Sequence, residues 1–153
     1  MADLTPRLHA ERDAWKAFVA LLETEQQALL GTDTDKLLGL SDSKIKAASE
    51  LGKLAEERRK ELHARGVADE AGSTAAWLQD NAAELMPIWR SIQQLAEKAQ
   101  QINRTNGVLI QSRLRHNQQA LMALQNAARS TSGLYGPDGQ PHLTTTGRIL
   151  GSV

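Results

Sequence analysis

The stretch from Ala82 to Arg129, AAELMPIWRSIQQLAEKAQQINRTNGVLIQSRLRHNQQALMALQNAAR, carries the longest helical pattern of the chain. Its apolar residues recur in steps of three and four, which is the spacing of one face of an α-helix. Pro87 lies near the expected start, where a proline is tolerated. The stripe comprises Leu85, Ile88, Ile92, Leu95, Ala99, Ile102, Asn106 and Leu109 and, after a slip of one residue, Ile110, Leu114, Asn117, Leu121, Leu124 and Ala128.

Two shorter helical patterns precede this stretch. The first covers about residues 5–30, where Leu8, Trp15, Leu22 and Leu29 recur every seven positions, as in a helix that packs along another helix. The second covers about 34–65; Asp33 or Thr34 can cap its start, and Gly66 can end it. The sequence therefore predicts an all-α fold: an antiparallel three-helix bundle, similar to a coiled coil, with a long third helix.

The predicted third helix is much longer than the two helices that would pack against it. From Leu85 to Arg129 it would span about 68 Å, whereas the first two helices would span roughly 39 and 47 Å. Part of it should therefore project, or bend at Asn106-Gly107, where a glycine weakens the helix by about 1 kcal/mol. The leftover apolar stripe is a docking face for another molecule, the contact of a self-associating coiled coil, or the result of helices that overlap unevenly.

The pattern changes after Arg129. Residues 130–153 contain five glycines, two prolines and no amphipathic period, which is typical of a flexible segment. We therefore expect a helical domain over 1–129, with helices over about 5–30, 34–65 and 82–129, followed by a flexible C-terminal tail over 130–153. Between the second and third helices, Ser73 could cap a single short helical turn.

The composition excludes several classes of protein. The chain has 153 residues, 18 basic and 18 acidic side chains and no cysteine, so disulfide frameworks, thiol nucleophiles and iron–sulfur clusters are ruled out. The longest uncharged apolar run, 17–22, is far shorter than the roughly 20 residues of a membrane span. The first residues are polar and do not resemble a signal peptide. We expect a soluble protein.

The sequence contains no pattern of catalytic residues. The glycines before the tail are isolated, so we expect no phosphate-binding loop. The four histidines are scattered, and none has the spacing of metal ligands on one helix face. The mixed charges of 56–61 predict a solvated helix face rather than a catalytic carboxylate pair. We therefore expect no enzymatic activity, no cofactor and no metal site.

Basic and amide side chains distinguish the third helix. From 81 to 129 the chain carries six basic residues against two acidic ones, which indicates an acidic or polar partner. Nucleic acid is a poor candidate, because no set of stacking aromatics lies among the arginines. Asn106 and Asn117 fall on the apolar stripe. They predict either an internal polar layer between the chain's own helices or the reversible docking of another helix.

A family motif runs through the third helix and the tail. The helix contains Asn103-Arg-Thr-Asn106-Gly107-Val-Leu-Ile110, then Arg113-Leu114, Asn117-Gln118-Gln119-Ala120-Leu121 and Leu124. The tail adds Leu134-Tyr135-Gly136-Pro137-Asp138-Gly139-Gln140, Gly147-Arg148 and Leu150-Gly151. Together with Trp89, these residues resemble the FlgN family of cytoplasmic chaperones for flagellar type III export. The resemblance is specific from Trp89 to the C-terminus; over 1–80 it rests on helix length and layout.

The resemblance implies three helices, a long third one, a mobile tail and a cytoplasmic location. Members of the family bind the two hook–filament junction proteins before export and cap their amphipathic C-terminal helices, which otherwise self-associate. They then deliver these clients to the type III export apparatus. By this resemblance the client-binding residues would be Ile102, Asn106, Leu109, Ile110, Leu114, Asn117, Leu121 and Leu124.

The resemblance also implies a role for the tail. The tail tyrosine of the family is associated with docking to the cytosolic domain of the export gate, and Tyr135 occupies that motif here; the alternative is that Tyr135 folds back on the bundle. The expected partners are thus the junction proteins and the export gate, with no nucleic acid and no membrane insertion. A further alternative is that the client-free protein forms a weak homodimer. The competing function is a structural or adaptor coiled coil that acts by self-association.

Overall fold

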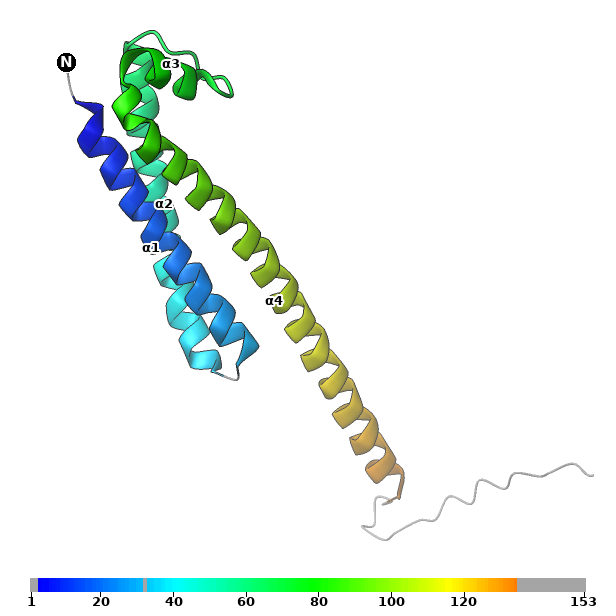
Figure 1. Ribbon diagram of the computed structural model, residues 1–153. Coiled ribbons are helices and arrows are strands. Elements are labelled where there is room, and N and C mark those ends of the chain that lie inside the picture. The colour runs from blue at the N-terminus through cyan, green and yellow to red at the C-terminus, as the bar shows by residue number, and fades with distance from the viewer. Residues whose placement is uncertain (1–2, 32, 135–153) are drawn as a thin grey trace, which may run out of the picture. The chain divides into compact units, whose positions relative to one another are not determined.

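The structure is a computed structural model that describes residues 3–31 and 33–134, with side chains as far as Ser130. Figure 1 shows the α-helices of the chain and the segments that join them. The elements are α1 (Leu4–Leu30), α2 (Thr34–Ala64), α3 (Ser73–Asn81), the 3₁₀ turn η1 (Ala83–Leu85) and α4 (Met86–Leu134). The predicted all-α fold is confirmed for these residues.

The chain divides into two compact units, Met1–Ile110 and Gln111–Val153. The first unit contains α1, α2, α3 and the beginning of α4, and the rest of α4 belongs to the second. The expected third helix is α4; it continues as a helix through Asn106-Gly107 and past Arg129 to Leu134. The remainder of the expected tail over 130–153, including Tyr135, lies outside the described residues.

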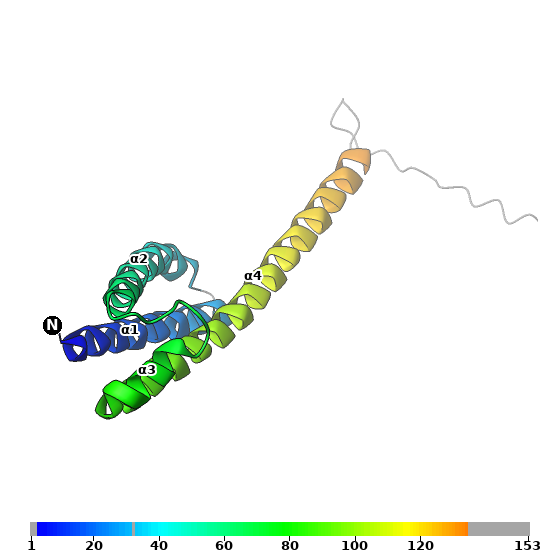
Figure 2. The same ribbon diagram turned by 90° about the horizontal axis from the view of Figure 1, so that it is seen from above.

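Within the first unit, the long helices form a bundle. Helices α1 and α2 lie side by side and run in opposite directions, as Figures 1 and 2 show. The beginning of α4 lies along α1 and runs in the same direction as α1, so α2 is antiparallel to both. This arrangement is the predicted three-helix bundle, with the short helix α3 added at one end.

Two apolar clusters hold the first unit together. The larger lies where α1 begins, α2 ends and α3 joins α4, and its most enclosed side chains are Leu8 and Leu78. The smaller lies further along α1 and α4; it is centred on Leu22, which is fully buried, together with Val19 and Ala99. Full burial of one leucine side chain contributes about 1.5–3 kcal/mol, so these clusters fix how α1, α2 and α4 pack.

Local signals in the sequence place the helix ends. The Asp3 carboxylate accepts a hydrogen bond from the Thr5 N–H at 2.9 Å at the start of α1, and this bond holds the pKa of Asp3 below its usual value. Asp33 caps α2 in the same way. Gly66, with φ of 82°, ends α2 in a left-handed conformation, and the Val67 N–H then donates to the Leu62 carbonyl oxygen at 3.0 Å.

Two local expectations were wrong. The connection between α2 and α4 contains a helix of nine residues rather than a single turn, and Ser73 is its first residue instead of its cap. Gly72, with φ of 83°, holds the N-cap position, where a left-handed conformation suits glycine. The long helix begins at Met86 instead of Ala82, because the 3₁₀ turn intervenes, and Pro87 is then its second residue.

Candidate functional site

Polar residues cross the first unit in two layers, and each layer links α1, α2 and α4. In the first layer, the buried Glu11 carboxylate of α1 accepts a hydrogen bond from Arg58 Nε of α2 at 2.8 Å. The Arg58 guanidinium also lies over the Trp89 ring of α4, 4.8 Å from the ring centroid. The charge of Arg58 is thus compensated by a carboxylate and an aromatic face. This layer is an internal structural contact rather than an open reaction site.

The second layer contains Asn106, one of the predicted client-binding residues. Asn106 is only 1% exposed, and its Nδ2 donates to Glu25 Oε1 of α1 at 2.9 Å and to the Leu22 carbonyl oxygen at 3.0 Å. Lys44 Nζ of α2 donates to the same Glu25 oxygen at 3.2 Å and to Asn103 Oδ1 at 3.3 Å. Of the two interpretations of Asn106, the internal polar layer is the one seen in this structure.

The other predicted client-binding residues of the first unit are partly covered. Ile102 packs against the smaller apolar cluster, and Leu109 is half-buried. Ile110, the last residue of the unit, is 46% exposed. Along the predicted stripe, Asn106 is therefore buried, Leu109 is half-buried and Ile110 is exposed.

The predicted residues of the second unit are all exposed. Leu114, Leu121 and Leu124 have 57%, 56% and 68% of their surface accessible, and Asn117 is also exposed. Their alternating steps of three and four place them on one side of α4, a spacing typical of a helix that packs against another helix. We call these four residues the leucine face. Exposed leucines in such a row are side chains that a complementary helix could cover.

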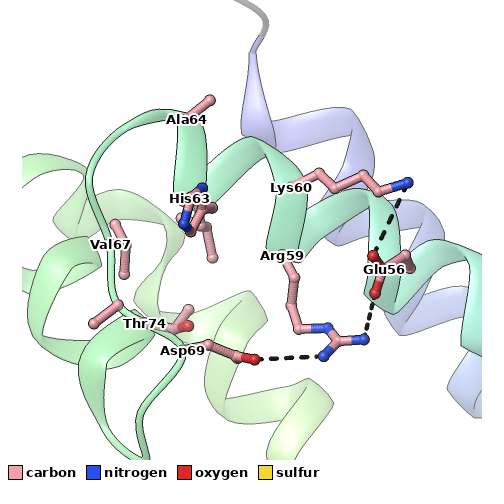
Figure 3. A pocket seen from close by; sticks show the side chains of 10 residues that line it. Glu56, Arg59, Lys60, His63, Ala64, Val67, Asp69 and Thr74 are labelled. Atoms are coloured by element: carbon pink, nitrogen blue, oxygen red, sulfur yellow. Dashed lines mark hydrogen bonds and ion pairs between the residues drawn. The ribbon is translucent and has the colours of Figure 1, made fainter.

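A separate pocket of about 400 Å³ lies between the end of α2, the following connection and α3 (Figure 3). Leu62, Ala64 and Val67 provide apolar lining. At its rim, Arg59 pairs with Asp69 and Glu56, and Lys60 Nζ lies 3.9 Å from Glu56 Oε1. These charged side chains therefore pair with one another at the rim of the pocket.

Sequence patterns missed part of the buried polar network. Arg58 was expected on a solvated face, but it is largely buried against Glu11 and Trp89. A signal was available, because Arg58 continues the apolar spacing of Leu51, Ala55 and Leu62 along α2. Over the residues that the structure describes, no group of three potential ligands could hold a metal, and no helix is long and apolar enough to cross a membrane.

Comparison with known proteins finds a family match over most of the chain. The model of the FlgN family, described as "FlgN protein", matches residues 1–142. This chain belongs to the FlgN family. The match includes the bundle, the leucine face and the position of Tyr135, so the family resemblance extends beyond the third-helix motif.

Two curated relatives share this family name. This FlgN-family chain is 42% identical over 59 residues to "Flagella synthesis protein FlgN" of Yersinia enterocolitica. The same identity is found with the protein of that name from the serotype O:8 / biotype 1B strain NCTC 13174 / 8081. Each match spans 39% of this chain and 39% of the relative's length. No solved structure matches the chain.

Proposed function

We propose that this FlgN-family chain is a cytoplasmic export chaperone of the bacterial flagellum. It binds the C-terminal helices of the hook–filament junction proteins, prevents their premature self-association and delivers them to the type III export apparatus. Membership of the family and the relatives' names, which refer to flagella synthesis, support a flagellar role. The function requires binding and release and no chemical step.

The observation that carries the proposal is the leucine face. In the first unit, the apolar side of α4 packs against α1 through Ala99 and Ile102. In the second unit the same kind of spacing continues, but Leu114, Leu121 and Leu124 are more than half exposed. A client helix with its own apolar stripe would bury these side chains, and the burial would stabilise the complex.

The burial data narrow the client-binding residues. Ile110, Leu114, Asn117, Leu121 and Leu124 are accessible without any rearrangement. Asn106 is 1% exposed, so contact between a client and its side chain would require α4 to leave α1 and would break both hydrogen bonds of Asn106. Ile102 and Leu109 are only partly accessible. We therefore assign the client to the accessible group, which begins at Ile110.

Calorimetric titration with a peptide from the C-terminal helix of a junction protein tests this function. We expect saturable one-to-one binding with a negative heat-capacity change, because apolar surface is buried. The L114E/L121E variant should lose binding, since each glutamate would place a charge in the apolar contact. The matched control is S112E/Q119E, which adds the same charges seven residues apart at exposed positions off the leucine face.

The control should bind like the wild-type chain, and circular dichroism should show that both variants keep their helices. Normal client binding by L114E/L121E would show that the leucine face is not the client site. Light scattering addresses the competing function. A tight dimer of the wild-type chain that L114E/L121E dissolves, together with no client binding, would favour a self-associating coiled coil.

A further inference from the structure

We propose that the helix that docks on the leucine face is acidic along its flanks: an amphipathic helix with glutamate or aspartate beside its apolar stripe. The proposal rests on the proposed function, because it specifies which client this face accepts. Its first basis is charge. From Gln111 to Leu134, α4 carries three arginines, at positions 113, 115 and 129, and no acidic residue.

Polar side chains of α4 lie in rows beside the leucine face. Gln111, Gln118 and Gln125 are seven residues apart and form a row next to Leu114 and Leu121. Arg115 and Arg129 lie in the next row, with Met122 between them. Both rows are exposed. A helix packed on the leucine face would place its flanking residues against the glutamines, within reach of the long arginine side chains.

The first unit shows how α4 meets a neighbouring helix. Lys98 Nζ of α4 lies 2.7 Å from Glu23 Oε1 of α1, and Asn106 Nδ2 donates to Glu25 Oε1 at 2.9 Å. Basic and amide side chains of α4 are thus matched by glutamates of α1. An external helix that continues this packing along the leucine face would present carboxylates to arginines and glutamines in the same way.

The same charges disfavour a second copy of this chain as the occupant. Two leucine faces packed together would bring the glutamine rows of both copies to the contact. The arginines of both copies would lie in the next rows, with no carboxylate from either α4 segment beside them. Like charges opposite one another oppose association, whereas opposite charges speed the encounter and add specificity. The occupant is therefore an acidic partner rather than a second α4.

The test uses two synthetic amphipathic helices with the same leucine stripe, one flanked by glutamate and the other by lysine. Titrated into the full chain at low salt, the glutamate-flanked helix should bind about tenfold more tightly. This advantage should shrink as added salt screens the charges. The R115E/R129E variant should reverse the preference. The control K46E/R90E makes the same charge change at exposed positions of the first unit. This control should keep the preference for the glutamate-flanked helix.

Equal affinity for the two synthetic helices, or a preference that survives R115E/R129E, would overturn the proposal. So would a junction-protein helix whose binding responds neither to salt nor to these variants, although the chaperone function would then stand. If only the junction-protein helix binds and both synthetic helices fail, acidic flanks do not define the partner and the proposal is again wrong. If all three fail to bind, the chaperone function itself is contradicted.

Discussion

Asn106 of α4 donates a hydrogen bond from Nδ2 to the main-chain carbonyl oxygen of Leu22 in α1, at 3.0 Å, across 84 residues of sequence. Leu22 is fully buried at the centre of the smaller apolar cluster. The bond therefore joins a polar side chain of α4 to the backbone of a fully buried residue of α1. A shift of α4 along α1 would leave this amide unpaired, so Asn106 selects one register for the helix pair.

Replacement of Asn106 by alanine should reduce the free energy of unfolding by about 1–2 kcal/mol, because two buried hydrogen bonds are lost. The loss is moderated by Asn106 Oδ1, which is buried without a hydrogen-bond partner among the described residues and disappears with the side chain. Urea unfolding measures the change. N103A is the control: Asn103 is exposed, and its removal should change stability by less than about 0.5 kcal/mol. Equal effects would rule out a special role for Asn106.

The Glu11–Arg58 pair should contribute far more to the free energy of unfolding than an exposed ion pair between the same two helices. Replacement of Glu11 by alanine leaves Arg58 largely buried without its carboxylate and should cost about 3 kcal/mol. The control is R7A, because Arg7 pairs with Glu57 at 2.8 Å on the exposed side of α1 and α2. Its loss should cost less than about 1 kcal/mol. Similar melting temperatures for the two variants would contradict this assignment.

Two glycines, one within α2 and one just after its end, should respond in opposite directions to replacement by alanine. Gly66 has φ of 82°, so G66A should destabilise the fold by about 1 kcal/mol, since an alanine is strained in that conformation. Gly52 lies in the middle of α2 with nothing within 4 Å of an added Cβ, so G52A should raise stability by about 1 kcal/mol through helix propensity. Thermal unfolding of both variants checks the pair, and a stabilising G66A would disprove the proposed helix end.

Replacement of Tyr135 by alanine should separate client binding from delivery, if the role that the family resemblance implies for this residue holds. Y135A should bind the junction-protein helix with unchanged affinity, because the residue is not part of the leucine face. Secretion of the junction proteins by cells that carry this variant should fall, since the family resemblance implies that Tyr135 docks to the export gate. Calorimetry and a secretion assay measure the two effects. Normal secretion would remove the docking role, whereas lost client binding would move Tyr135 into the client site.

The periodicity of the sequence determined much of the fold. Three long apolar stripes predicted three long helices, and Gly66 indicated the end of α2 because its position requires a left-handed backbone. The same spacing placed Asn106 and Asn117 on the apolar stripe of α4. These features depend on residues close together in the chain, whose effects on a helix are local and follow from helix geometry.

Only the tertiary structure decided which parts of the α4 stripe are covered. Asn106 and Leu121 both lie on the apolar stripe, yet Asn106 is buried against α1 and Leu121 is more than half exposed. Periodicity states which side of a helix is apolar, but burial depends on which other helix reaches that side. The pairing of Arg58 with Glu11 and Trp89 has the same cause, because it joins residues from three helices that only packing brings together.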